Sequence, residues 1–248
     1  IVASGTEGGT NLFEIKYFEK VAYLAQSPQF YKEHGVAGLE RVFETAHVYR
    51  AEPHATSRHL TEYYSLDLEM GFISGPEEII QLERELLTYV FEKLNQDFNE
   101  VIKSRYSKAL PSMLKVPTWH FCECLDRLKM AHGRSDLVDD LDPEAERQLC
   151  KLAEKETGVA GVFVLGFPLS GRPFYTHPLV PKQPNAWSDT WSASENTQEN
   201  SLKYPQSNSE FGTKSPRLTV GQNSVPAAAS FDLLFNGLEI TTGGQRLH

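Results

Sequence analysis

The dipeptide Asn236-Gly237, which separates two apolar runs, constrains the fold of this chain more than any other local feature. Asn-Gly favours the tight turn whose backbone twist matches that of two paired antiparallel strands. The flanking residues therefore predict a β-hairpin that carries Asp232 on its first strand and Glu239 on its second. The glycine pair at 243–244 then allows the backbone to bend or to come close to a ligand just before Arg246.

Three charged residues of this region, Asp232, Glu239 and Arg246, follow one another at two equal steps of seven. On one unbroken strand, odd steps would place successive charges on opposite faces of the sheet. A turn removes this conflict, because Asp232 and Glu239 then belong to different strands. The spacing leaves two interpretations open, either a surface hairpin with solvated charges or one site whose charges meet different ligands.

Length and composition are typical of a globular protein. The chain has 248 residues, of which 40% are hydrophobic and 11% aromatic, and these can fill a sizeable core. No run approaches the roughly 18 apolar residues of a membrane helix, and the first residues lack the basic flank of a signal peptide, so we expect no membrane segment and a cytoplasmic location. The three cysteines match neither a disulfide framework nor a zinc pair. The net charge of -9 argues against non-specific coating of nucleic acid but leaves room for a locally basic groove.

The chain divides into three zones of different character. Residues 1–72 contain short aromatic and β-branched runs broken by Gly and Pro, which predict mixed sheet. Residues 75–165 are predicted to be mostly helical, with Asp142 as the cap of one helix and a buried strand at 162–165. Residues 178–226 are polar and rich in Ser, Asn, Gln and Pro, which predicts a long and partly flexible excursion.

A second predicted hairpin, over residues 43–70, carries cations at both ends of its loop. Arg50 ends the first strand, and Arg58 and His59 begin the return. Guanidinium groups match phosphate oxygens in a bidentate way, so these residues could hold a polyphosphate. Ordinary surface ion pairs explain the same spacing equally well. Because the chain has no Walker loop and no GxGxxG motif, a phosphate site here would be built from side chains.

The same hairpin resembles a motif of a known family. The matching segments are Tyr49-Arg50-Ala51-Glu52, Arg58-His59-Leu60-Thr61-Glu62 and Leu66-Asp67-Leu68-Glu69-Met70. They resemble motif 2 of class II aminoacyl-tRNA synthetases, in the form found in archaeal and eukaryotic aspartyl-tRNA synthetases. Residues 6–13 are similar to that family's flipping loop, residues 24–32 to its aspartate-binding signature, and residues 172–176 and 237–248 to further motifs. The resemblance spans almost the whole chain outside the polar excursion.

The resemblance implies an α+β fold with an antiparallel β-sheet flanked by helices. It implies an aspartate-tRNA ligase, which forms aspartyl-adenylate from aspartate and ATP with Mg²⁺ and then transfers aspartate to the 3′ end of a tRNA. Residues 1–248 would be part of the catalytic domain, because the family's motif 1 should precede Ile1 and its motif 3 should follow His248. The full-length protein is then expected to be a homodimer.

The resemblance also implies roles for single residues. Arg50 would be the catalytic residue, on the α-phosphate of ATP, and Glu52 would contact adenine. The remaining assignments are Arg58, His59 and Glu239 for ATP; Glu7, Gln29 and Asp67 for the ammonium of aspartate; Lys32 and Arg246 for its side-chain carboxylate; and Asp232, Glu239 and Thr242 for the metal.

Three alternatives stay open at this point. A paralogue could use aspartyl-adenylate to make asparagine from ammonia, and an N-terminal anticodon-binding domain would argue against it. An asparaginyl-tRNA synthetase is disfavoured, because Gln29 with Lys32 suits a carboxylate better than an amide. A catalytically silent binding module is disfavoured by the presence of Arg50, Glu52 and Asp232.

Overall fold

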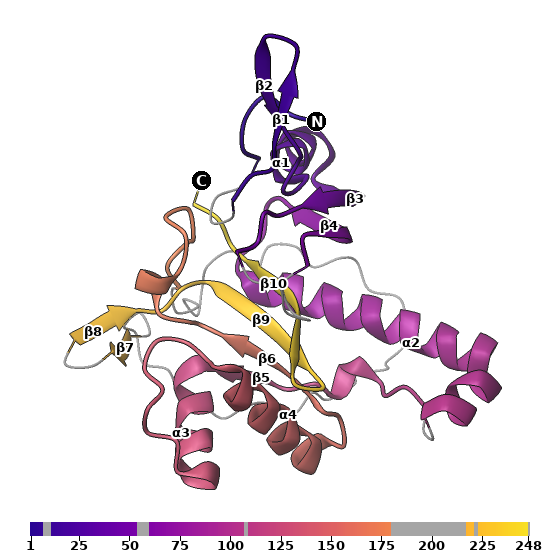
Figure 1. Cartoon of the computed structure of the whole chain (residues 1–248). Helices are drawn as coiled ribbons and strands as arrows, with labels where there is room; N and C mark the ends of the chain where they lie inside the picture. Colours follow the sequence, from indigo (N-terminus) through magenta and orange to yellow (C-terminus); the bar gives the residue numbers. More distant parts are fainter. Residues whose placement is uncertain (7–10, 54–59, 107–108, 180–216, 221–222, 248) are drawn as a thin grey trace, which may run out of the picture. The chain divides into compact units, whose positions relative to one another are not determined.

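The computed structural model of the chain divides into two compact units, Ile1–Ile79 and Ile80–His248 (Figure 1). The structure describes all residues except 7–10, 54–59, 107–108, 180–216, 221–222 and 248. No helix among the described residues combines the length and the apolar character needed to cross a lipid bilayer.

Unit 1 consists of two antiparallel hairpins and one helix. Its elements are β1 (Glu14–Tyr17), β2 (Lys20–Tyr23), α1 (Gln29–Leu39), β3 (Arg41–Tyr49) and β4 (Glu62–Met70). Strands β3 and β4 pair without interruption from Arg41 opposite Met70 to Tyr49 opposite Glu62, which confirms the hairpin predicted over residues 43–70.

Helix α1 lies in the zone for which the sequence predicted only sheet, so that prediction is wrong for residues 29–39. The helix begins without a side-chain cap and has no acidic residue in its first turn, and the usual local signals of a helix start are therefore missing. Contacts with β3 and β4 hold it in place, with Gln29 and Lys32 as its buried residues. Tertiary packing rather than local pattern fixes this element.

Unit 2 is built on a four-stranded sheet in the order β10-β9-β6-β5. Its strands are β5 (Thr118–His120), β6 (Gly161–Leu165), β9 (Ser230–Phe235) and β10 (Leu238–Gly244). All neighbouring strands are antiparallel except β5 and β6, which are parallel. The structure confirms the predicted antiparallel sheet, and the strand predicted at 162–165 is β6, whose residues are all buried.

Helices cover both faces of this sheet (Figure 1). They are α2 (Pro76–Tyr106, with a kink at Phe98), α3 (Phe121–His132) and α4 (Pro143–Thr157), and two 3₁₀ turns lie at Met113–Lys115 and Leu169–Gly171. Arg84 of α2 donates to the hydroxyl of Thr118, whereas Arg127 of α3 lies 3.9 Å from the ring centroid of Trp119. Because neighbouring residues of a strand point to opposite faces, α2 and α3 pack on opposite sides of β5.

The C-terminal hairpin has the predicted turn and an irregularity that the sequence did not indicate. Asn236 and Gly237 have φ angles of 52° and 80°, as the predicted turn requires. The register shifts between Glu239 and Thr241, so Ile240 is the extra residue of a β-bulge. A Cβ added at Gly243 would lie 2.6 Å from Cζ of Phe231, so the backbone at this glycine approaches the neighbouring strand closely.

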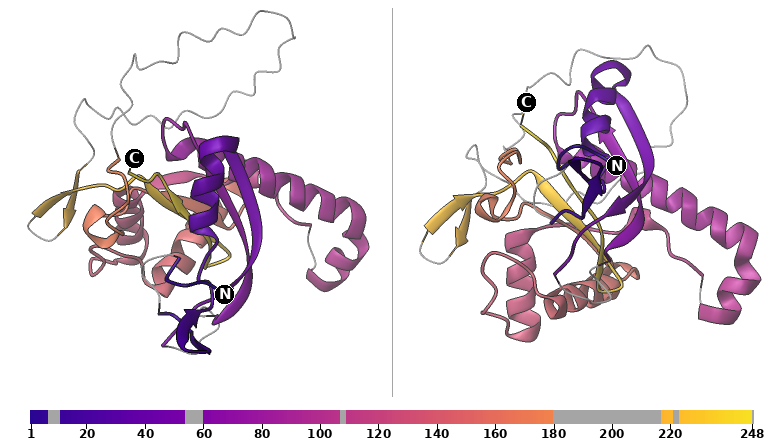
Figure 2. Two further views of the ribbon diagram at one scale, coloured as in Figure 1. Left: turned by 90° about the horizontal axis from the view of Figure 1, so that it is seen from above. Right: turned by 45° about the horizontal axis from the view of Figure 1, so that its top comes forward.

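The polar excursion predicted at 178–226 contains a strand pair, β7 (Arg217–Val220) and β8 (Asn223–Pro226), that the sequence did not indicate. Residues 180–216 lie outside the described part of the chain. Single antiparallel bridges, Pro168 with Ala227 and Pro178 with Ala228, tie the segments that flank this region to each other. Figure 2 shows β7 and β8 at one edge of unit 2, beside the 3₁₀ turn at Leu169–Gly171.

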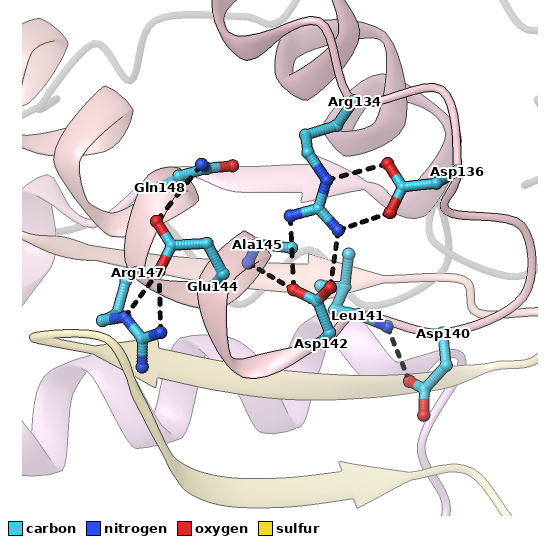
Figure 3. A network of polar contacts seen from close by, with 9 residues as sticks. All are labelled: Arg134, Asp136, Asp140, Leu141, Asp142, Glu144, Ala145, Arg147 and Gln148. Carbon is cyan, nitrogen blue, oxygen red and sulfur yellow. Dashed lines mark hydrogen bonds and ion pairs between the residues drawn. The ribbon is translucent and has the colours of Figure 1, made fainter.

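The start of α4 is organised around Asp142, the predicted cap (Figure 3). Its Oδ1 accepts a hydrogen bond from the backbone N–H of Ala145 at 2.8 Å. The guanidinium of Arg134 bridges the carboxylates of Asp136 and Asp142, and it lowers the pKa of Asp142. One aspartate therefore caps the helix and also fixes the loop that leads into it.

Replacing Asp142 with alanine is expected to lower the free energy of unfolding by about 1 to 2 kcal/mol, the usual effect of losing a helix cap. Urea unfolding of the protein measures this loss. The control is Asp140→Ala, because the Asp140 carboxylate accepts only from the adjacent N–H of Leu141 among the hydrogen bonds drawn in Figure 3. Equal losses in the two variants would contradict the capping role.

Candidate functional site

The residues predicted to form the site belong to both units. Unit 1 holds Gln29, Lys32, Arg50, Glu52 and Asp67, and unit 2 holds Asp232, Glu239, Thr242 and Arg246. Glu7, Arg58 and His59 lie outside the described residues, so their roles stay predictions. Within unit 1 Lys32 contacts Asp67, and within unit 2 Thr242 contacts Asp232.

A buried lysine is the centre of the polar residues in unit 1. Lys32 Nζ donates to Asp67 Oδ1 at 3.0 Å and lies 3.5 Å from Glu69 Oε2. Gln29 Nε2 donates to the same Glu69 oxygen at 2.8 Å. Only 5% of Lys32 is exposed, and a buried charge of this kind requires charged or hydrogen-bonding partners. We call Gln29, Lys32, Asp67 and Glu69 the lysine cluster.

The local structure of two elements explains why these four side chains meet. Gln29 and Lys32 stand three residues apart on α1, so they lie on one face of the helix. Asp67 and Glu69 stand two residues apart on β4, so they point to the same side of the hairpin. The hydroxyl of Ser27, which precedes the N-cap residue Pro28, accepts a hydrogen bond from the backbone N–H of Gln29 at 3.0 Å.

The charges of this cluster suit a ligand that carries both signs. Glu33 also accepts a hydrogen bond from Gln29 Nε2, at 3.0 Å, so one lysine and three carboxylates gather around the cluster and their formal charges sum to a negative value. The buried Asp67 Oδ2 accepts no hydrogen bond from any residue that the structure describes, and such an oxygen costs about 1 to 3 kcal/mol unless a donor reaches it. The ammonium group of a ligand is a fitting donor. Lys32 has three N–H donors and can serve an anionic group as well.

Glu69 is a member of the cluster that the sequence reasoning did not select. Its Oε2 lies 3.5 Å from Lys32 Nζ and accepts a hydrogen bond from Gln29 Nε2 at 2.8 Å. Its two-residue distance from Asp67 on a predicted strand was the available signal, because that distance places both carboxylates on one face.

Arg50 and Glu52 continue the chain just beyond the end of β3. The backbone N–H of Arg50 donates to the carbonyl of Thr61 at 2.9 Å, and that of Ala51 donates to the carbonyl of Asn11 at 3.0 Å. The guanidinium carbon of Arg50 lies 5.7 Å from the ring centroid of Tyr63. Backbone bonds and an aromatic ring thus fix the position of the predicted catalytic arginine.

In unit 2 the predicted metal-binding residues gather around Asp232. Its Oδ1 accepts a hydrogen bond from the Thr242 hydroxyl at 2.7 Å, and its Oδ2 accepts one from Arg172 Nη2 at 2.8 Å. Asp232 is only 7% exposed, so both partners compensate the burial of its charge. The Arg172 guanidinium also lies 3.9 Å over the ring of Phe167. Arg172 was not among the predicted site residues.

The bulge at Ile240 places Asp232, Glu239 and Thr242 on one face of the sheet. Thr242 pairs with Asp232, and Glu239 pairs with Leu234, which stands two residues after Asp232 on β9. With regular pairing of Ile240, Thr241 would take the place opposite Asp232 and Thr242 would turn to the other face. The extra residue therefore brings two carboxylates and a hydroxyl to the same side.

The oxygen donors of this face fit a magnesium ion. Carboxylate and hydroxyl oxygens are hard ligands, and Mg²⁺ is usually bound through one or two carboxylates together with water and phosphate oxygens. No group of three or more His, Cys, Asp or Glu within the described ranges could hold a metal ion by itself. A magnesium ion here would thus depend on the phosphates of a bound nucleotide for much of its coordination.

A buried acid of α2 faces the side of β10 that is opposite to Glu239 and Thr242. Glu83 of α2 is 6% exposed and accepts a hydrogen bond from the hydroxyl of Thr241. Burial raises the pKa of Glu83 from 4.5 to about 7, and the hydrogen bond from Thr241 and the charge of Arg84 only partly oppose this. The strand that bears Glu239 and Thr242 therefore rests on a carboxyl group that is protonated in part near neutral pH.

The sequence and the fold are similar to those of known proteins. A family model described as tRNA synthetases class II (D, K and N) matches residues 1–248. An aspartate–tRNA(Asp/Asn) ligase of Deinococcus radiodurans is 40% identical over 248 residues, which are 100% of this chain and 48% of that protein. The protein of the same name from Thermus thermophilus is 38% identical over 257 residues, with the same two coverages.

A solved structure has a similar fold. It is the crystal structure of asparaginyl-tRNA synthetase from Pyrococcus horikoshii complexed with asparaginyl-adenylate. The TM-score is 0.70 at 26% sequence identity, over 99% of this chain and 47% of that one. The chain spans about half the length of the curated relatives that it matches.

Replacing Glu83 with glutamine is expected to flatten the pH dependence of stability. Above pH 4.5 the unfolded state releases the proton that the folded state keeps up to about pH 7, so the free energy of unfolding falls as the pH rises through this window. The fall should be about 3 kcal/mol in the unaltered protein and absent in Glu83→Gln. Urea unfolding at pH 5 and pH 8 measures it. The exposed Glu92→Gln serves as control, and a Glu83→Gln variant that keeps the full pH dependence would refute the assignment.

Proposed function

We propose, from the fact that this chain belongs to the class II tRNA synthetases (D, K and N), that it is part of the catalytic domain of an aspartate-tRNA ligase. In the first step the α-carboxylate of aspartate attacks the α-phosphorus of ATP, which forms aspartyl-adenylate and releases pyrophosphate. In the second step the aspartyl group passes to the 3′ end of a tRNA. The observation that carries the proposal is the lysine cluster of unit 1.

The lysine cluster has the charges that recognition of aspartate needs. The buried Asp67 Oδ2 offers an acceptor to the ammonium group of the amino acid. Lys32 offers a cation to its side-chain carboxylate, and Arg246 of unit 2 is proposed as the second cation. The amide of asparagine would leave Lys32 without an anion, and a buried group that loses its partner can reject a near-isostere by a large factor.

The groups proposed for ATP act by position and charge. Arg50 would meet the α-phosphate, where negative charge develops during the in-line displacement, and Glu52 would meet adenine. Arg58 and His59 are proposed for the distal phosphate. No nucleophile from the protein is required, because the substrate's own carboxylate attacks.

Asp232, Glu239 and Thr242 would hold the magnesium ion, and Glu239 would also serve ATP. When bound, the ion would supply positive charge beside the phosphates of ATP. In the hydrogen bond from Thr242 to Asp232, the hydroxyl proton of Thr242 points toward the carboxylate. The lone pairs of the Thr242 oxygen therefore stay available to an ion.

The names of the relatives support aspartate as the amino acid and tRNA as the acceptor. Both relatives described above are named for tRNA(Asp/Asn), so tRNA(Asp) and tRNA(Asn) are both proposed acceptors. A homodimer in the cytoplasm follows from the resemblance and stays a prediction.

Exchange of pyrophosphate into ATP, measured without tRNA on the protein that carries this chain, is expected with aspartate and not with asparagine. Exchange with asparagine alone would point instead to an asparaginyl-tRNA synthetase. A folded protein that binds ATP and shows no exchange with either amino acid would be a binding module. Addition of tRNA or of ammonia to the aspartate reaction then separates tRNA charging from asparagine synthesis.

Replacing Lys32 with methionine is expected to raise the KM for aspartate by about 10- to 100-fold, because a charged hydrogen bond to the substrate is lost. The KM for ATP should stay close to that of the unaltered protein. Pyrophosphate exchange at varied aspartate and varied ATP gives both values. The matched control is Lys20→Met, because Lys20 is an exposed lysine of β2. A similar rise in both KM values would remove Lys32 from the amino acid pocket.

A further inference from the structure

A short segment, Arg172-Pro173-Phe174-Tyr175-Thr176, lies directly along the residues around Arg246. Thr176 and Arg246 form an antiparallel bridge. The backbone N–H of Leu247 donates to the carbonyl of Tyr175 at 2.7 Å, and that of His177 donates to the carbonyl of Gln245 at 2.9 Å. These bonds on both sides of the bridge fix the two backbones relative to each other. We call residues 172–176 the buttress segment.

The ring of Tyr175 supports the side chain of Arg246. The guanidinium carbon of Arg246 lies 4.2 Å from the centre of the Tyr175 ring, and both residues are half-buried. A guanidinium group is attracted to an aromatic face, and it is planar with all its N–H donors directed outward in that plane. Contact with the ring face therefore constrains the orientation of the Arg246 guanidinium plane.

Arg172, the first residue of the buttress segment, has its guanidinium held in a different way, by Phe167 and Asp232. It lies 3.9 Å from the centre of the Phe167 ring, but it also donates to Asp232 at 2.8 Å. Its charge thus serves a carboxylate of the protein. The contact of Arg246 with the uncharged Tyr175 ring is instead a cation–π contact.

We propose that Tyr175 is a positioning residue for the selection of aspartate. Its ring holds Arg246 in the orientation that receives the side-chain carboxylate of the amino acid, which lowers the rotamer entropy that the arginine loses on binding. The inference rests on the proposed function, in which Arg246 is a carboxylate-binding residue.

Pyrophosphate exchange tests this role in the protein that carries this chain. Tyr175→Leu is expected to raise the KM for aspartate by about 2- to 30-fold, the range of a cation–π contact. The kcat and the KM for ATP should stay unchanged. The preference for aspartate over asparagine, as a ratio of kcat/KM values, should fall by the same factor, because a neutral side chain gains little from an oriented cation.

Two variants separate orientation from general disturbance of the segment. Tyr175→Phe keeps the ring and should retain the aspartate KM of the unaltered protein. Phe174→Leu removes a ring at the neighbouring position, where the side chain is 92% exposed, and should also have no effect.

Four results would overturn the inference. They are an unchanged aspartate KM in Tyr175→Leu, an equal rise in the KM values for aspartate and ATP, the same loss in Tyr175→Phe, and the same loss in Phe174→Leu. An unaltered protein that shows no exchange with aspartate would overturn the proposed function itself, and the assignment of Tyr175 with it. In each of the four results on the variants, the unaltered protein still activates aspartate. Failure of the Tyr175 assignment is therefore distinguishable from failure of the proposed function.

Discussion

The burial of charge is the constraint on which both candidate sites depend. Lys32 and Asp232 are each almost fully removed from solvent, at 5% and 7% exposure, and burial of a charge is costly without partners. Lys32 is held between the carboxylates of Asp67 and Glu69, and Asp232 between a guanidinium and a hydroxyl. Because such groups must meet in space, they determine how α1 lies on its hairpin and where the segment around Arg172 must run.

The two arrangements differ in what they leave for a ligand. In unit 2, both oxygens of Asp232 accept a hydrogen bond from the chain, which fixes the orientation of this carboxylate. In unit 1, Asp67 Oδ2 has no partner among the described residues, so the lysine cluster is electrostatically incomplete. A bound ammonium group would complete it. A protein that keeps such an unsatisfied oxygen in a buried place gives up stability and gains a position for a substrate.

Sequence reasoning predicted those features that depend on residues close together along the chain. The turn at Asn236-Gly237, the cap at Asp142 and the hairpin over residues 43–70 each follow from local backbone chemistry, and all three are present. Helix α1 was missed because it lacks a cap and is stabilised by contacts with β3 and β4. Position and resemblance identified Asp67 and Asp232, whereas their actual partners depend on long-range packing.

The partners that were missed share one physical cause. Arg172 reaches Asp232 across 60 residues of chain, and the ring of Tyr175 meets Arg246 after a similar interval. No periodicity or spacing records a contact of this kind, because the intervening residues can take many paths. Glu69 is the exception, since its position two residues after Asp67 already placed it on the right face of a strand.

The bulge in β10 has a consequence for how the length of this hairpin can vary. Ile240 has no residue opposite it on β9. Deletion of this one residue would therefore leave Thr242 across from Asp232. A further residue inserted between the turn and Thr242 has no such compensation and would move that hydroxyl away from its acid. In an evolving family, this hairpin should therefore tolerate shortening at one position far more readily than growth.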